Sequence, residues 1–293
     1  MTTCPLCGSA NIDHCLTVKD HTVSRESFDI MHCSNCSGRF TQDVPSPAYI
    51  GKYYQSADYI SHTDTREGIV NKLYHQVRKI TLNQKKRLVE QVTARKKGKL
   101  LDVGAGTGLF VQTMRKAEWQ VIGLEPDAGA RKLAANMNIN LDDPATLFTL
   151  PDASFDAITL WHVLEHVHEL HQYLDQCRKL LAASGKLIVA VPNYTSADAR
   201  HYGSNWAAYD VPRHLYHFSP AAMQMLMNKH DFRLVKTYPQ WFDSFYVSLL
   251  SEQYKTGKSK LLKGAWEGMV SNFKAVGNKE RCSSVIYVCT QRH

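Results

Sequence analysis

A glycine-rich turn between a short apolar segment and a helical segment limits the folds open to this chain. Residues 99–103 predict a strand, Gly104-Ala-Gly-Thr-Gly108 follows, and residues 109–117 have helical periodicity. Further strands are predicted at 120–124, 139–141, 155–160, 186–191, 233–237 and 284–290. Because parallel strands need long crossover connections, which are usually helices, this alternation predicts an α/β fold with a largely parallel sheet.

Composition excludes several other classes. The chain has 293 residues, of which 44% are apolar and 21% charged, as in an ordinary globular protein. The sequence has no apolar run of about 18 residues, so we expect no membrane span. The N-terminus lacks a basic segment followed by an apolar one, so we expect no secretory leader and a cytoplasmic location.

Four of the eight cysteines form two closely spaced pairs, Cys4 with Cys7 and Cys33 with Cys36. A two-residue gap lets both thiolates of a tight turn reach one ion, and two such turns complete a tetrahedron around Zn²⁺. We therefore predict a structural zinc ribbon over residues 1–45. A redox pair, an iron–sulfur site and a degenerate knuckle are the alternatives.

The rest of the chain divides at composition changes. Two prolines near residue 45 mark a boundary, and residues 46–97 predict a helical lead that ends in a basic helix. Residues 98–293 form the predicted main domain, with inserts near 193–218 and 241–279. Eleven basic and two acidic residues lie between Arg66 and Lys99. This local charge of +9 indicates either a solvated helix face or an anionic partner such as RNA.

The glycine loop and the next strand end indicate a nucleotide-like ligand. The loop reads G-x-G-x-G, whereas the dinucleotide fingerprint needs glycine at position 109, which is leucine. Glu125 ends the second predicted strand, seventeen residues after Gly108. A carboxylate at this place can accept hydrogen bonds from both ribose hydroxyls.

The 155–160 strand is followed by Trp161-His-Val-Leu-Glu-His166, and the 186–191 strand lies within Gly185–Asn193. Together with the glycine loop and Glu125, these segments make residues 95–237 resemble the class I S-adenosylmethionine-dependent methyltransferases. The resemblance implies a Rossmann-like seven-stranded sheet with an antiparallel last strand, helices on both faces, and S-adenosylmethionine as cofactor. It also implies a set of cofactor-binding residues: Asp102, Gly104, Ala105, Gly106 and Gly108 around the methionine part, Glu125 at the ribose, Pro126 and Asp143 near the adenine, and Trp161 beside the sulfonium.

Methyl transfer to a hydroxyl needs a base, and histidines crowd the second half of the chain. His162, His166 and His214 are the candidates; Glu165 and His166 recur in ubiquinone-type O-methyltransferases, which this region resembles. Residues 209–220 resemble a segment of bacterial small-molecule and cell-surface-saccharide methyltransferases. From this segment and its neighbourhood we expect Arg213, Tyr209 and Trp206 to contact the substrate.

Two motifs that are absent from the sequence reduce the range of acceptor groups. After the 155–160 strand the chain lacks the Asn/Asp-Pro-Pro-Tyr/Phe motif usual in enzymes that methylate adenine or glutamine amines, and it lacks the Pro-Cys motif of cytosine C5 enzymes. The leading hypothesis is methyl transfer to a small-molecule hydroxyl, such as that of a saccharide or a quinone-like metabolite. The alternatives are an RNA methyltransferase that grips phosphates with the ribbon and basic helix, a non-catalytic binding protein, and an oxidoreductase with a nicotinamide cofactor.

Overall fold

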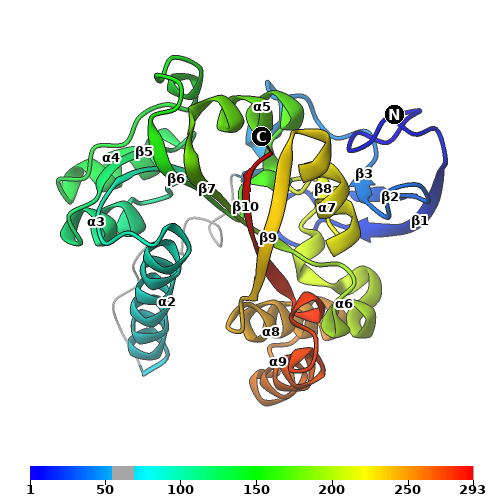
Figure 1. The fold of residues 1–293 in the computed structure, drawn as a ribbon. Coiled ribbons are helices and arrows are strands. Elements are labelled where there is room, and N and C mark those ends of the chain that lie inside the picture. The colour runs from blue at the N-terminus through cyan, green and yellow to red at the C-terminus, as the bar shows by residue number, and fades with distance from the viewer. Residues whose placement is uncertain (55–68, 293) are drawn as a thin grey trace.

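The computed structural model of the protein describes residues 1–54 and 69–292 and places a six-stranded sheet at their centre (Figure 1). The strand order is β5-β4-β6-β7-β10-β9. The bounds are β4 Lys99–Val103, β5 Gln120–Leu124, β6 Phe155–Trp161, β7 Leu181–Pro192, β9 Phe232–Pro239 and β10 Ser284–Gln291. Strands β5, β4, β6 and β7 pair in parallel, and β10 is antiparallel to both of its neighbours. This confirms the predicted α/β fold.

The predicted strand at 139–141 is the one departure in this sheet. Within the described residues it is reduced to a single parallel bridge between Leu124 and Asp142, so six strands form where seven were expected. Pro144 has no amide to donate, and Asp143 caps the short 3-10 helix η2, Pro144–Phe148. The chain therefore turns away from the edge of β5 after one bridge.

Helices cover both faces of the sheet because each strand presents alternate residues to opposite sides. Leu100 faces the layer that contains Val89 and Phe110, whereas Leu101 faces the layer that contains Leu174 and Met223. The first layer holds α2 Ile69–Thr93, α3 Leu109–Lys116 and α4 Ala128–Asn136; the second holds α5 Leu170–Leu180 and α7 Pro220–Lys229. Part of the predicted helical lead, residues 55–68 with Arg66, lies outside the described residues.

A second, smaller sheet contains the cysteine pairs. Its order is β1-β2-β3-β8, with β1 Ile12–Lys19, β2 Ser27–Cys33, β3 Arg39–Thr41 and β8 Tyr216–His217. A 3-10 helix, η1 Ile50–Tyr54, follows β3 along the chain. The last strand of this sheet comes from the predicted insert at 193–218, because Arg39 and Phe40 pair with His217 and Tyr216. The domain boundaries 1–45, 46–97 and 98–293 stay a prediction.

The two predicted inserts contain the remaining helices. The first holds α6 Ala197–Tyr202 and two 3-10 helices, η4 Gly203–Asn205 and η5 Ala207–Tyr209. The second forms α8 Asp243–Thr256 and α9 Leu261–Ala275, followed by η6 Lys279–Arg281. The axes of α8 and α9 approach closely because a Cβ on Gly264 or Gly268 would lie 2.8 Å from the α8 backbone.

A buried arginine joins the small sheet to the rest of the molecule. Arg213 is 1% exposed, and its Nη2 lies 3.1 Å from Asp20 Oδ1 and 2.6 Å from Asp210 Oδ1. Its Nη1 donates to the carbonyl of Tyr53 at 2.8 Å. Burial opposes the charge of Asp20, but the amides of Ser24 and Thr22 and the guanidinium hold the pKa of that carboxyl well below its usual range.

Arg213→Met should destabilise the fold strongly, because it leaves the buried Asp20 and the half-buried Asp210 without their cation. Breaking a buried ion pair in this way costs about 3–5 kcal/mol. Urea unfolding measures the change, and Arg233→Met on exposed β9 is the matched control. A midpoint equal to that of the control would contradict the bracing role.

Candidate active site

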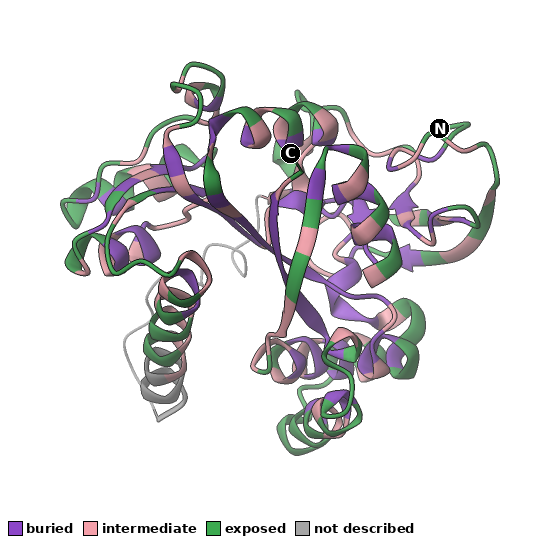
Figure 2. Cartoon of the chain, viewed as in Figure 1, coloured by how far each residue is buried: buried purple, intermediate pink, exposed green. Residues whose placement is uncertain are grey.

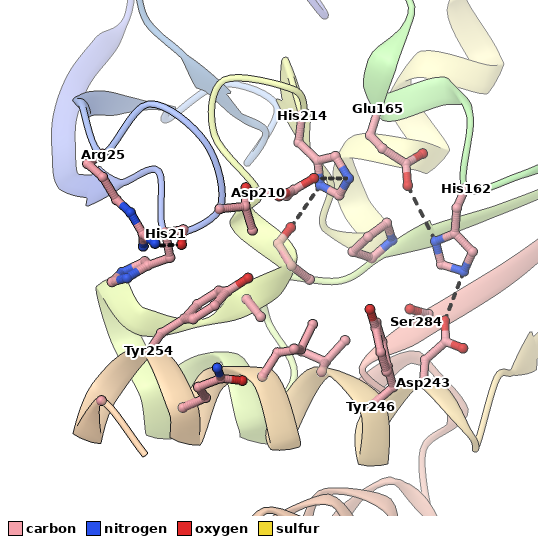
Figure 3. A pocket seen from close by; sticks show the side chains of 18 residues that line it. His21, Arg25, His162, Glu165, Asp210, His214, Asp243, Tyr246, Tyr254 and Ser284 are labelled. Carbon is pink, nitrogen blue, oxygen red and sulfur yellow. Dashed lines mark hydrogen bonds and ion pairs between the residues drawn. The ribbon is translucent and has the colours of Figure 1, made fainter. Parts of the chain in front are cut away.

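A cavity of about 760 Å³ opens at the carboxyl end of β6 (Figure 3). Its walls come from three separate parts of the chain: the turn at residues 21–25 of the small sheet, residues 207–214, and the inner face of α8. His162 and Glu165 form one end, where β6 and the 3-10 helix η3, Leu164–His166, meet. The cavity is of the size and mixed polarity that small-molecule sites have.

His162 lies between two carboxylates. Its Nδ1 is 3.3 Å from Glu165 Oε1, and its Nε2 is 2.8 Å from Asp243 Oδ2 on α8 (Figure 3). Burial opposes the charge of this ring, but Asp243 and Glu165 outweigh burial and raise the pKa of His162 to about 10. His162 is therefore an imidazolium at neutral pH and has no free nitrogen with which to take a proton.

Glu165 contributes a fully buried carboxylate to this end of the cavity. No described residue donates a hydrogen bond to its Oε1 or Oε2. Burial favours the neutral acid, but His162 holds the pKa of Glu165 below its usual range. The carboxylate is therefore an acceptor whose hydrogen-bonding capacity the described residues leave unused.

The other two predicted histidines lie against each other near Glu165. The rings of His166 and His214 meet edge to face with centroids 4.6 Å apart. Burial and the neighbouring His214 lower the pKa of His166 to about 4. His214 Nδ1 donates to the carbonyl of Ala208 at 2.9 Å, so Nε2 is the acceptor nitrogen of the neutral ring.

The same neighbourhood offers metal ligands. Glu165, His166 and His214 each offer one ligand atom, a carboxylate oxygen or a ring nitrogen, and these three atoms lie within 4.8 Å of one another. A carboxylate with two imidazoles is a ligand set that divalent transition metals accept.

The three residues predicted to contact the substrate do not line the cavity. Arg213 forms ion pairs with Asp20 and Asp210. Trp206 is 1% exposed and donates a hydrogen bond from Nε1 to Asp198 at 2.8 Å. Tyr209 is 2% exposed and accepts a hydrogen bond from Arg39 at 2.7 Å. These side chains are buried among protein partners behind the cavity wall, and their contact with a substrate stays a prediction.

The glycine loop lies beside this end of the cavity, at the carboxyl end of β4. Gly104, Gly106 and Gly108 all have positive φ, which favours glycine. A Cβ on Gly104 would lie 2.3 Å from Val163, and one on Gly108 would lie 2.7 Å from Ile139, whereas one on Gly106 would meet nothing within 4 Å. The first and third glycines permit close packing, and the middle one faces open space that a ligand can occupy.

Acidic and aromatic groups surround the loop. Glu125 is 8% exposed and accepts hydrogen bonds from the amides of Gly106 and Asp127. Burial raises the pKa of Asp102 to about 7, although Thr159 donates to its carboxylate. Trp161 has a buried, unpaired Nε1, and Lys85 of α2 places its ammonium 4.5 Å from the ring centroid.

The remaining predicted cofactor residues border the loop. Gly104 and Ala105 donate their amides to the carbonyl of Leu124, which ties the loop to β5. Pro126 is exposed, and Arg131 bridges it to Asp143: the guanidinium is 3.0 Å from the Pro126 carbonyl and 3.4 Å from the Asp143 carboxylate. The structure thus brings the predicted cofactor residues to one edge of the sheet. Sequence reasoning missed Lys85, Arg131 and Asp243, which no motif marks.

The four paired cysteines converge. Sγ of Cys4 lies 3.7 Å from that of Cys36, and Sγ of Cys7 lies 3.6 Å from that of Cys33. A tetrahedral site with Zn–S bonds of about 2.3 Å needs sulfur atoms about 3.8 Å apart, so the donor set fits this ion. Hydrogen bonding from Cys36 lowers the pKa of Cys4 to about 5, which favours the thiolate that binds a metal.

His162→Gln should lower stability by an amount that depends on pH. Because the folded-state pKa is raised, the stabilisation is complete below the unfolded pKa of about 6.5 and is lost as the pH rises through about 10. The wild-type advantage in free energy of unfolding should therefore shrink by up to about 1.4 kcal/mol per pH unit over this window. Urea titrations at several pH values measure it, with the half-exposed His201→Gln as control. A constant advantage would contradict the ion pairs.

Comparison with known sequences places the chain in a family. Residues 74–237, more than half of the chain, match the family described as a methyltransferase domain. A ubiquinone biosynthesis O-methyltransferase from Rhodopseudomonas palustris is 27% identical over 143 residues, which are 45% of this chain and 56% of that protein. One from Nitrobacter winogradskyi is 33% identical over 101 residues, 32% of this chain and 39% of that protein. The chain thus spans about half or less of these relatives' lengths.

Solved structures agree on the fold. An S-adenosylmethionine-dependent methyltransferase from Archaeoglobus fulgidus has a TM-score of 0.50 at 17% identity, covering 73% of this chain and 94% of its own. The PH0226 protein from Pyrococcus horikoshii has a TM-score of 0.50 at 15% identity, covering 80% and 98%. The chain therefore belongs to the methyltransferase family, and its larger sheet and helices form a class I S-adenosylmethionine-dependent methyltransferase domain.

Proposed function

We propose that the protein transfers a methyl group from S-adenosylmethionine to a hydroxyl group of a small molecule held in the cavity. The observation that carries the proposal is the junction at the end of β6. There, Trp161 borders the glycine loop, and the next residue, His162, lines the cavity. A methyl donor on one side of this junction and an acceptor on the other would meet in line, which supplies much of the rate of such a reaction.

The residues around the glycine loop fit the cofactor. Glu125 would accept hydrogen bonds from the ribose hydroxyls, in place of those it now takes from the Gly106 and Asp127 amides. Asp102 would face the amino-acid part, and the Trp161 ring, already in contact with the Lys85 cation, would lie near the sulfonium. When bound, the cofactor supplies an electrophilic methyl group.

We assign the role of general base to His214 and a positioning role to His162. His162 is protonated and held from both sides, whereas His214 keeps Nε2 available at the cavity wall, 3.9 Å from Asp210. His214 Nε2 would take the single proton of the acceptor hydroxyl, while the Glu165 carboxylate would accept a hydrogen bond from a second hydroxyl of the same molecule and so orient it. His166 stays neutral and supports the His214 ring.

The relatives support a hydroxyl acceptor, because the curated proteins that this chain matches include several ubiquinone biosynthesis O-methyltransferases. The cavity, of about 760 Å³, has room for a metabolite-sized molecule. For the cysteine cluster we propose one structural Zn²⁺, since four thiolates leave no open position for chemistry.

Cofactor binding is tested at two positions with S-adenosylhomocysteine as the probe. Glu125→Gln and Gly106→Ala should each weaken its binding about tenfold or more, or by about 1.4 kcal/mol. The control for Gly106→Ala is Gly257→Ala, because Gly257 also has positive φ and open space around the added Cβ. Isothermal titration measures the affinities; wild-type affinity in both test variants would refute the assignment.

The base assignment is tested by turnover. A panel of catechols, nucleotide sugars and short RNAs first identifies an acceptor through release of S-adenosylhomocysteine. His214→Ala should then lower kcat about 10²–10⁴-fold, with cofactor affinity unchanged. Wild-type turnover in His214→Ala would exclude it as the base, and methylation of RNA alone would replace the small-molecule proposal.

The metal proposal is tested by elemental analysis. The wild-type protein should hold one zinc per chain, and Cys36→Ser should lose it and unfold at a lower temperature, because a closed four-thiolate site stabilises its own fold. Cys15→Ser is the matched control, since Cys15 lies on β1 of the same sheet and outside the cluster. Full zinc content in Cys36→Ser would contradict this ligand set.

A further inference from the structure

Helix α9 presents an apolar face to solvent. Its large outward side chains are highly exposed: Leu262 91%, Trp266 59%, Met269 47%, Phe273 79% and Val276 69%. Their spacing of three or four residues places them on one side of the helix. Figure 2 shows α9 as the outermost helix at its end of the molecule, mostly exposed.

The opposite side of α9 is already occupied. Gly264, Gly268, Ser271 and Ala275 are buried, and the two glycines pack against the α8 backbone. The polar and apolar sides of an ordinary surface helix are thus reversed here: small residues face the protein and large apolar ones face out. Within residues 1–54 and 69–292, no element covers the outward face.

Exposed cations surround this face. Between residues 255 and 281 there are seven basic and two acidic residues, a local charge of +5. They lie before the helix, along one flank and after it: Lys255, Lys258, Lys260, Lys263, Lys274, Lys279 and Arg281, all exposed. One of them, Lys263, is paired with Glu252 of α8 at 3.0 Å. An apolar stripe bordered by lysines is typical of helices that lie in the headgroup region of an anionic bilayer.

The positive charge around α9 distinguishes between two partners for its apolar face, a second copy of the chain and an anionic surface. A second copy related by a two-fold axis would bring one +5 segment against another, which opposes association. An anionic surface is instead complementary, and each basic residue near it contributes attraction. The structure contains no described helix long and apolar enough to cross a membrane.

We propose that α9 docks the protein on an anionic phospholipid surface, with Leu262, Trp266 and Phe273 inserted at the level of the headgroups. The stripe from Leu262 to Val276 spans about 21 Å at 1.5 Å per residue, enough for a helix lying flat. Helix α8 lies between this surface and the cavity, since its other side carries the cavity-lining Val247 and Leu250. Docking would therefore hold the cavity one helix layer from the lipid.

Sedimentation with vesicles tests the proposal. Wild-type protein should bind vesicles of mixed phosphatidylglycerol and phosphatidylcholine, bind pure phosphatidylcholine weakly, and dissociate as salt is raised. The double variant Leu262→Glu, Phe273→Glu should bind the anionic vesicles at least about tenfold more weakly. Lys258→Gln and Lys260→Gln should each reduce binding roughly fivefold and only on the anionic vesicles.

The matched control is Leu133→Glu, an exposed leucine on α4 (43% exposed) far from α9 in the fold. Circular dichroism and S-adenosylhomocysteine titration verify that each variant is folded. Equal vesicle binding by the wild type and the double variant would overturn the proposal. So would a dimer in light scattering that the double variant dissociates, together with no vesicle binding by the wild type.

Discussion

The ion pairs of His162 with Glu165 and Asp243 hold the two halves of the site together. Glu165 follows the same strand as His162, whereas Asp243 begins α8, which forms the opposite wall of the cavity. The imidazolium compensates the charges of the buried Glu165 and the half-buried Asp243. The positive φ of His162 turns its side chain toward both partners at the end of β6. The cavity therefore opens where the sheet also presents its glycine loop.

The smaller sheet, β1-β2-β3-β8, also supports the cavity. Strand β8 completes it from the far side of the chain, Arg213 holds the Asp20 turn, and that turn supplies His21 and Arg25 to the cavity wall. A cysteine cluster that fixes the small sheet would thus fix one wall of the cavity, without taking part in chemistry. This arrangement gives a structural role to the Zn²⁺ that we propose for the cysteine cluster beside the methyltransferase domain.

Sequence patterns predicted what local spacing and periodicity determine. Six of the seven predicted strands, the glycine turn and the two closely spaced cysteine pairs depend on residues close in sequence, and the structure contains them, although β7 begins earlier than predicted. The patterns could not identify Asp243 as the partner of His162, because that pairing depends on how α8 packs. For the same reason they could not show that Arg213 pairs with Asp20 and Asp210, and its predicted contact with the substrate stays untested. The strand expected at 139–141 is reduced to one bridge, and the chain turns away at Pro144.

The central claim is that cofactor and acceptor meet at the end of β6. A crystal structure with S-adenosylhomocysteine tests it most directly. The account predicts ribose hydroxyls on Glu125 and the sulfur atom beside Trp161, facing the end of the cavity formed by Glu165 and His214. A sulfur atom separated from that cavity by protein, or adenosine bound away from the glycine loop, would contradict the account.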